Sequence, residues 1–222
     1  MSEGPVLVTD LDRTFTTLEL GPDPCAMAAT HAWRAAGNRC VLATGRSAKI
    51  LDEWPELARA FDGYVLEGGA VWGRPGAWTI RHDRAALAAA ARALREDRVP
   101  FEERSASLSA WRRDVAAVQR AAAAAGCDVA PNRDRVEVVP RGVDKGSSVA
   151  ILLAAWGGPV PIAAIGDGEN DLSLFRLGGR RVAVANAVPE LAAAADEVAP
   201  LPAAAGYAWF VRERLLPAGR AP

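Results

Sequence analysis

Short apolar runs, each followed by a polar segment, recur along the first part of the chain. They occupy residues 6–8, 40–43 and 64–66, and branched apolar residues are frequent in them. Two stretches with helical patterns, about 24–37 and 48–61, separate these runs. A buried strand, a polar loop and a helix in repetition are typical of βαβ units and predict a parallel sheet.

The pattern changes at residues 72–76, whose glycines and proline suit a hinge or a tight connection. Beyond this point the chain predicts a helix, two strands, a second helix and two further strands, in that order. The two helices are expected over about 84–97 and 112–125. This order indicates a small α+β layer, spanning residues 77–140, that is inserted into a larger domain.

After residue 140 the first pattern resumes, with helices expected over about 146–156 and 190–195 and apolar runs at 161–165 and 182–184. The fold class that we predict is therefore α/β, with a doubly wound, Rossmann-like parallel sheet and an inserted α+β layer. The predicted boundaries are 1–76 and 141–222 for the main domain and 77–140 for the inserted layer.

Composition excludes several classes of function. With 222 residues, 50% of them hydrophobic, the chain is long enough for one sizeable core, or for a main domain carrying a smaller one. A net charge of −1 provides no basic field for nucleic acid or an anionic membrane surface. There is no signal-peptide pattern or membrane-spanning apolar run, and the three cysteines lack zinc or disulfide spacing. We therefore expect a cytoplasmic protein without nucleic-acid or membrane partners.

The polar clusters that follow the predicted strands carry the candidate chemistry. Taken alone, Asp10 and Asp12 suit a surface turn as well as a site. In an open α/β sheet, however, ligands bind at the carboxyl ends of the strands, so this pair should lie near residues 44–46 and the acidic segment 167–171. Four carboxylates gathered there would repel one another unless a cation neutralised them. Because hard oxygen ligands select such an ion, the sequence predicts Mg²⁺.

Competing motifs fit less well. Asp10-x-Asp12-x-Thr14 and Asp167-x-Glu169-x-Asp171 match the first three ligand positions of an EF-hand calcium loop. Both lack its turn glycine and its final glutamate. The chain also has no P-loop, no complete dinucleotide-binding fingerprint and no Gly-x-Ser-x-Gly nucleophile elbow.

Four segments, in order along nearly the full length, resemble the motifs of the haloacid dehalogenase-like (HAD) phosphohydrolases. They are Asp10-Leu-Asp12-Arg-Thr14, Thr44-Gly45-Arg46, Gly142-Val-Asp-Lys145-Gly, and Gly166-Asp167-Gly168-Glu-Asn170-Asp171. The inserted layer falls between the second and third segments, where members with a small type IIB cap carry that cap. The resemblance is to Cof-like, archaeal phosphoglycolate phosphatase-like and sucrose-phosphatase-like members.

This resemblance implies roles for the matching residues. Asp10 would attack phosphorus and form an aspartyl-phosphate, and Asp12 would protonate the leaving group and later activate water. Lys145, one of only two lysines among the 26 basic residues, would neutralise charge on the transferred group. The implied Mg²⁺ ligands are Asp10, Asp12 through its backbone carbonyl, Asp167 and Asp171. The implied phosphate-binding residues are Thr44, Gly45, Arg46 and Asn170.

Two positions depart from the family pattern. Arg13 stands where glycine is usual, so its side chain points either at solvent or at the substrate. Gly68 stands where many relatives carry asparagine.

Substrate specificity should depend on the polar residues of the cap. For each of these candidates, however, an ordinary exposed surface charge is the simpler interpretation. These candidates are Glu102, Arg104, Arg133, Arg135 and Glu137.

The sequence therefore predicts a Mg²⁺-dependent phosphatase that acts on a small phosphomonoester through an aspartyl-phosphate. Sugar phosphates, polyol phosphates and phosphoglycolate remain open as substrates, and the pattern does not indicate an oligomeric state. A phosphosugar mutase of the same superfamily is the alternative. A sugar-phosphate sensor without enzymatic activity fits less well, because the acidic residues of the motifs and Lys145 are all present.

Overall fold

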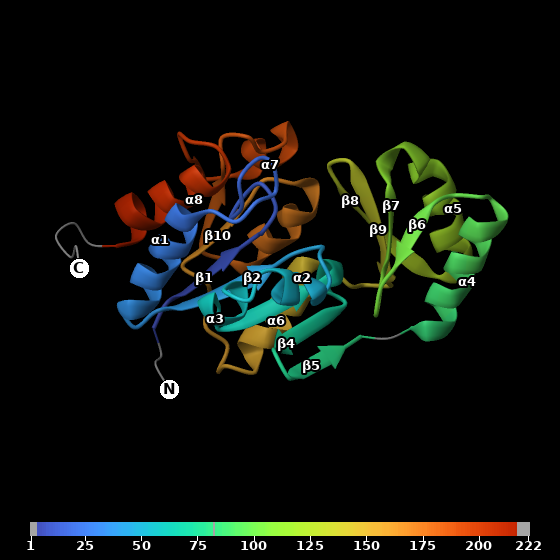
Figure 1. Ribbon diagram of the computed structural model, residues 1–222, viewed down its shortest axis with the longest axis horizontal. Coiled ribbons are helices and arrows are strands. Elements are labelled where there is room, and N and C mark those ends of the chain that lie inside the picture. Colours follow the sequence, from blue (N-terminus) through green and yellow to red (C-terminus); the bar gives the residue numbers. More distant parts are fainter. Residues whose placement is uncertain (1–3, 82, 217–222) are drawn as a thin grey trace.

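Eight strands form the larger of two sheets, in the order β12-β11-β10-β1-β2-β3-β4-β5. Neighbouring strands from β12 to β3 are parallel, whereas β4 and β5 are added as an antiparallel edge. The computed structural model describes residues 4–81 and 83–216 (Figure 1). The strands are β1 (Val6–Thr9), β2 (Arg39–Ala43), β3 (Gly63–Leu66), β4 (Val71–Arg74), β5 (Ala77–Ile80), β10 (Ala163–Gly166), β11 (Arg180–Ala183) and β12 (Glu197–Val198).

Alternating side chains of the central strands face two separate layers of helices. Val6 and Val8 of β1 pack in one apolar cluster with Val149 and Leu152 of α6 (Lys145–Ala154). Leu7, between them, packs on the opposite face with α1 (Pro24–Ala35) and α8 (Ala203–Phe210). Because both faces are covered, these strands are apolar throughout, and the charged residues lie beyond their carboxyl ends. The α/β fold class predicted from the sequence is confirmed.

The smaller sheet is antiparallel, in the order β6-β7-β9-β8, and it has its own apolar core. Helices α4 (Arg84–Glu96) and α5 (Val115–Ala125) cover its face away from the large sheet (Figure 1). On β9, Val136 and Val138 point into this core, so Arg135 and Glu137 lie on the opposite face. The strands are β6 (Phe101–Glu103), β7 (Leu108–Trp111), β8 (Cys127–Asn132) and β9 (Arg135–Pro140).

Several elements differ from the predicted ones. Pro55 interrupts the single helix expected over 48–61, which becomes α2 (Lys49–Glu53) and α3 (Leu57–Ala60). Of the two structures expected at residues 72–76, a hinge or a tight connection, the chain forms the tight connection, which is the β4–β5 hairpin. Since β5 pairs with β4 in the large sheet, the boundary that we propose for the inserted layer moves from residue 77 to residue 81. Residues 1–3, 82 and 217–222 of the predicted domains lie outside the described residues.

The remaining helical elements connect these strands. Residues 169–177 wind as a 3₁₀ helix. The other short elements are the 3₁₀ turns η1 (Glu67–Gly69) and η2 (Arg112–Asp114), the 3₁₀ helix η3 (Glu169–Leu177), α7 (Pro189–Ala194), and η4 (Val211–Leu215), which is a π-helical turn.

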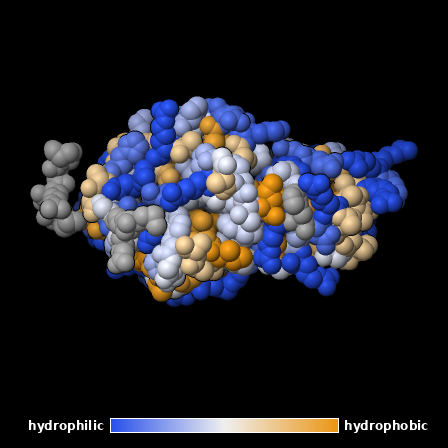
Figure 2. Space-filling view, turned by 90° about the horizontal axis from the view of Figure 1, so that it is seen from below, coloured by the Kyte–Doolittle hydropathy of each residue, from blue (hydrophilic) through white to orange (hydrophobic). Residues whose placement is uncertain are grey.

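Polar residues cover most of the face shown in Figure 2, and hydrophobic residues form small groups between them. Large apolar side chains with substantial exposure include Ile80, Ile151 and Val160. Single exposed apolar residues of this kind are ordinary for a folded protein. Among the described residues, no helix has both the length and the apolar character needed to cross a membrane.

Glu67, at the end of β3, links the two sheets. Its carboxylate accepts hydrogen bonds from the backbone N–H of Ala106 at 2.8 Å and from the hydroxyl of Ser107 at 2.9 Å. The backbone N–H and the hydroxyl of Ser105 also donate to it. The side chain is 1% exposed, and these donors belong to the β6–β7 loop. One carboxylate therefore holds this loop against the large sheet.

Replacing Glu67 with alanine is expected to lower the free energy of unfolding by about 3 kcal/mol, because several buried donors lose a charged acceptor. Urea unfolding followed by far-UV circular dichroism measures the change. Glu19→Ala, which removes an exposed carboxylate, is the matched control and should lie within about 0.5 kcal/mol of the wild type. Equal values for the two variants would show that the link does not contribute to stability.

Candidate active site

Three buried carboxylates meet at the carboxyl end of the large sheet. Asp10 follows β1, and Asp167 and Asp171 follow β10. One oxygen from each carboxylate lies within 4.8 Å of the other two. The sheet positions them because β1 and β10 are parallel neighbours, so both strands end at the same edge.

Lys145 lies among these carboxylates. It is the first residue of α6, it is 1% exposed, and its Nζ donates to Asp10 Oδ1 and to Asp171 Oδ1, both at 2.7 Å. Burial by itself would lower the pKa of Lys145, but Asp10 and Asp171 raise it above its ordinary value. The lysine is therefore a fixed positive charge beside Asp10.

The acidic groups remain only partly neutralised. Burial first, and then the charge of Asp171, raise the pKa of Asp10 well above its usual range. The same two causes raise the pKa of Asp167 to about 6. A divalent cation would offset this repulsion, and a set of carboxylate oxygens suits Mg²⁺. The residues present thus fit the ion that the family resemblance implies.

Asn170 lies on the same loop and has an unusual environment. Within the described part of the chain, neither its Oδ1 nor its Nδ2 has a hydrogen-bond partner, although both atoms are buried. Its Oδ1 lies close to Gly168 in this loop. Buried amide groups rarely stay unpaired, so this side chain is suited to contact a ligand.

The side chain of Asp12 occupies a different position from the other acidic residues. Its carboxylate receives hydrogen bonds from Nε and Nη2 of Arg46, at 3.0 and 2.8 Å, and remains 24% exposed. Among the described residues, the buried acidic group comprises Asp10, Asp167 and Asp171, and the Asp12 carboxylate lies outside it. Arg46 therefore contacts Asp12, the predicted catalytic acid. Whether Arg46 also binds phosphate stays a prediction.

Thr44 and Gly45 form the loop after β2. The Thr44 hydroxyl is buried and accepts a hydrogen bond from the backbone N–H of Arg46 at 3.1 Å, which tightens the loop. Any side chain at position 45 would overlap Glu137 of the smaller sheet. Glycine at this position leaves the space that the Glu137 carboxylate occupies, where the second sheet packs against this loop.

Arg13 adopts φ 59°, in the left-handed region that glycine normally occupies. This conformation favours glycine, the residue that the family pattern has at this position, and Arg13 adopts it while carrying a side chain. Arg13 lines the cavity described below, and its Nη1 lies 3.8 Å from Asp134 Oδ1 in the β8–β9 turn. Of the two directions left open by the sequence, the side chain takes the one toward the cavity.

The β8–β9 turn also contacts the acidic loop. Arg133 Nε donates to Asp167 Oδ2 at 2.6 Å, and its backbone N–H donates to Glu169 Oε2 at 2.9 Å. Arg112 pairs with the same glutamate. Charged contacts therefore hold the β8–β9 turn and Arg112 against the end of the large sheet that carries the acidic group.

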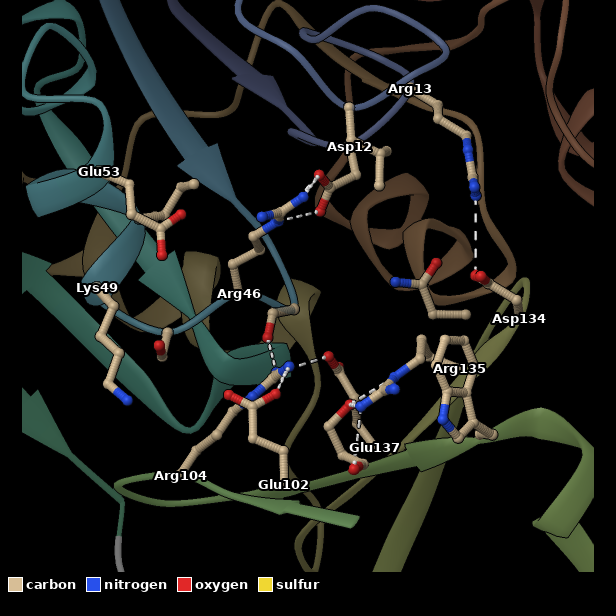
Figure 3. Close-up of a pocket in the computed structure, with 17 residues that line it drawn as sticks. Asp12, Arg13, Arg46, Lys49, Glu53, Glu102, Arg104, Asp134, Arg135 and Glu137 are labelled. Carbon is tan, nitrogen blue, oxygen red and sulfur yellow. Dashed lines mark hydrogen bonds and ion pairs between the residues drawn. The ribbon is translucent and has the colours of Figure 1, made fainter. Parts of the chain in front are cut away.

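A cavity of about 360 Å³ lies between the two sheets (Figure 3). In Figure 3, Asp12 and Arg46 approach it from the large sheet, whereas Glu102, Arg104, Arg135 and Glu137 approach it from the smaller one. Its lining residues are Asp12, Arg13, Leu20, Gly45, Arg46, Ser47, Lys49, Ile50, Glu53, Glu102, Arg104, Ser109, Trp111, Asn132, Asp134, Arg135 and Glu137.

Two of the polar specificity candidates are more buried than the sequence suggested. The expectation of ordinary surface charge is wrong for Glu137, which is 3% exposed, and for Arg104, whose side chain is 12% exposed. The expectation of surface charge is correct for Glu102, whose side chain is 48% exposed. The alternation of Val136, Glu137 and Val138 shows that Glu137 lies on the face opposite the core, but only the packing of the two sheets reveals that this face is covered.

Comparisons with known proteins agree with this geometry. The family model of haloacid dehalogenase-like hydrolases matches residues 129–211. Phosphoglycolate phosphatase of Methanothermobacter thermautotrophicus is 31% identical over 213 residues, which cover 93% of this chain and 96% of that protein. Phosphoglycolate phosphatase 2 of Saccharolobus solfataricus is 44% identical over 71 residues, only 32% of this chain and 30% of that protein.

A solved structure shows the same fold. The crystal structure of Thermoplasma acidophilum 0175 superposes with a TM-score of 0.82 at 18% sequence identity, covering 95% of this chain and 97% of that one. At this identity the similarity concerns the arrangement of both sheets and their helices. The pairing of a large parallel sheet with a smaller antiparallel one is thus shared with a protein of known structure.

Proposed function

The chain belongs to the haloacid dehalogenase-like hydrolases and is a phosphatase, and from this premise we propose that it hydrolyses a small phosphomonoester with Mg²⁺. The observation that carries the proposal is the buried group of Asp10, Asp167 and Asp171 with Lys145 between two of them. When bound, Mg²⁺ would be held by these three carboxylates and would neutralise charge on the phosphoryl group. We retain the backbone carbonyl of Asp12 as a further predicted ligand.

In the proposed reaction, a carboxylate oxygen of Asp10 attacks phosphorus, and the bond from phosphorus to the ester oxygen breaks. The leaving alkoxide takes a proton from Asp12. In the second half, Asp12 accepts a proton from water as the water oxygen attacks phosphorus, which frees phosphate and restores Asp10. Lys145 would support both halves because its ammonium, 2.7 Å from Asp10, would lie beside the phosphoryl group that Asp10 attacks and would neutralise negative charge on that group.

Three further features support this scheme. Arg46 holds the Asp12 carboxylate at the cavity, which orients the proposed proton donor. Thr44, the Gly45 amide and Asn170 are the proposed phosphate contacts, and the unpaired amide of Asn170 fits that role. We propose that the inserted layer, from residue 81 to residue 140, acts as a cap that keeps water from the cavity.

The size of the cavity and the named relatives both favour a small substrate. About 360 Å³ accommodates a small metabolite ester but not a folded phosphoprotein. The Methanothermobacter thermautotrophicus relative, which aligns over 96% of its length, is named as a phosphoglycolate phosphatase, and this supports small phosphomonoesters as the substrate class.

The test is phosphate release from p-nitrophenyl phosphate by the purified chain, with and without Mg²⁺. Removing divalent ions with EDTA should lower the rate more than about tenfold, because the carboxylates then repel the substrate. Restored Mg²⁺ should restore the rate, and calorimetry should show Mg²⁺ binding that Asp167→Asn weakens. Full activity in EDTA would refute the metal-dependent mechanism, and phosphate transfer to a second sugar instead of release would favour a mutase.

A further inference from the structure

Arg133 brings a positive charge from the inserted layer to the buried acidic group. Its Nε donates to Asp167 Oδ2 at 2.6 Å, and its Nη2 donates to the backbone carbonyl of Asn186. The Asp167 side chain is 3% exposed, so this ion pair is largely removed from water. The attraction between the two charges is therefore stronger than in an ion pair on the protein surface.

Each of the three carboxylates that would hold Mg²⁺ thus has a cationic partner in this structure. Lys145 Nζ lies 2.7 Å from both Asp10 and Asp171. Arg133 supplies the partner of Asp167. The guanidinium therefore occupies, beside Asp167, the role of counter-ion that a metal ion would have.

Both oxygens of Asp167 already have donors. Thr14 Oγ1 donates to Oδ1 at 3.3 Å, whereas Arg133 Nε and, at 3.4 Å, Asn186 Nδ2 donate to Oδ2. A divalent ion would bring two further positive charges to a carboxylate that a guanidinium contacts, and like charges this close repel one another. Arg133 therefore opposes Mg²⁺ binding, whichever oxygen the ion uses.

Of the two cations, Arg133 is the one that can leave. Lys145 is 1% exposed and begins α6, whereas the side chain of Arg133 is 24% exposed and belongs to the β8–β9 turn. The turn also has contacts that do not use this guanidinium, because Glu169 accepts from the backbone N–H of Arg133 and pairs with Arg112. A rotation of the Arg133 side chain is thus enough to free Asp167.

Building on the proposed function, we propose that Arg133 competes with Mg²⁺ for Asp167. Without the ion, the guanidinium neutralises this carboxylate and fastens the β8–β9 turn to the acidic loop. When Mg²⁺ binds, Arg133 gives up Asp167. Because the coupling is reciprocal, one side chain of the inserted layer lowers the Mg²⁺ affinity, and Mg²⁺ in turn weakens this contact between the layers.

Calorimetric titration of Mg²⁺ into desalted, metal-free protein without substrate tests the proposal. Arg133→Gln should lower the Kd for Mg²⁺ by about tenfold or more, because it removes the competing charge. Arg133→Lys retains a cation and should bind Mg²⁺ less tightly than Arg133→Gln.

Arg135→Gln is the matched control, since it removes an equal charge from the same sheet. The Arg135 guanidinium donates to Ser109 and lies 4.5 Å from the ring centroid of Trp111. Its Kd for Mg²⁺ should stay within about threefold of the wild type, because a more distant charge is screened. An equal gain in affinity in Arg135→Gln would show an effect of net charge and would overturn the proposal.

Thermal unfolding separates competition from a purely structural role. In EDTA, Arg133→Gln should lower the unfolding temperature, because buried Asp167 loses its counter-ion. In saturating Mg²⁺ this deficit should shrink, since the variant binds the ion more tightly. A deficit that Mg²⁺ leaves unchanged, or a Kd for Arg133→Gln at or above the wild-type value, would overturn the proposal.

The assay of p-nitrophenyl phosphate hydrolysis distinguishes this proposal from the proposed function. Mg²⁺-dependent hydrolysis together with equal Mg²⁺ affinity of the wild type and Arg133→Gln would refute the competition alone. Tighter Mg²⁺ binding by Arg133→Gln without hydrolysis by the wild type would refute the proposed function and support the competition.

Discussion

Asp10→Asn is expected to lower phosphate release by on the order of 10³-fold or more, since it removes the proposed nucleophile. The amide keeps the shape of the side chain but does not attack phosphorus. The fold should be unaffected, because Lys145 retains Asp171 as a partner at 2.7 Å. Burial and the charge of Asp171 already raise the pKa of Asp10, so a neutral group there relieves repulsion.

Phosphate release from p-nitrophenyl phosphate in saturating Mg²⁺ measures this loss, and thermal unfolding verifies the fold. Asp196→Asn is the matched control. Asp196 pairs with Arg181 on the outside of the large sheet, and its carboxylate is not part of the acidic group. The control should keep wild-type activity. If Asp10→Asn kept more than about a tenth of the wild-type rate, Asp10 could not be the nucleophile.

Lys145→Met is expected to lower the free energy of unfolding by about 3–5 kcal/mol in EDTA, because it leaves buried carboxylates without their cation. Lys145 is 1% exposed and donates to both Asp10 and Asp171, so no water can replace it without rearrangement. Mg²⁺ should recover part of this loss by neutralising the same carboxylates. Phosphate release should fall by about 10²-fold even in Mg²⁺, since the charge beside the phosphoryl group is absent.

Lys49→Met provides the comparison for stability, because Lys49 is exposed and is the other lysine of the chain. Its free energy of unfolding should lie within about 0.5 kcal/mol of the wild type. Urea unfolding in EDTA and in Mg²⁺ measures both variants. Equal stability of Lys145→Met and Lys49→Met would contradict the interpretation that the buried lysine holds the acidic group together.

Much of the fold was predictable because it depends on local patterns. The apolar runs before Asp10 and Asp167 form β1 and β10, and both are buried on both faces. Their carboxylates meet because parallel neighbours end at the same edge of a sheet. The errors also have local causes, such as Pro55, which divides one expected helix into α2 and α3.

The details of the cavity were less predictable because they depend on contacts across the two sheets. Arg133 contacts Asp167 although 34 residues separate them. Arg13 was recognised as an exception in its motif, but its left-handed backbone and its position near Asp134 emerge only from the structure. Contacts of this kind leave no periodic signal along the chain.

By itself, then, the sequence determined the α/β fold class and the residues that follow each central strand, because these depend on neighbouring positions. Only the tertiary structure decided which cap side chains reach the cavity. From the sequence, Glu137 is expected to be an exposed surface charge. The packing of β9 against Gly45 and Gly68 instead buries its carboxylate beside the loop that carries Thr44 and Gly45. The physical reason is that burial at this position is set by the partner sheet and not by the strand that carries the residue.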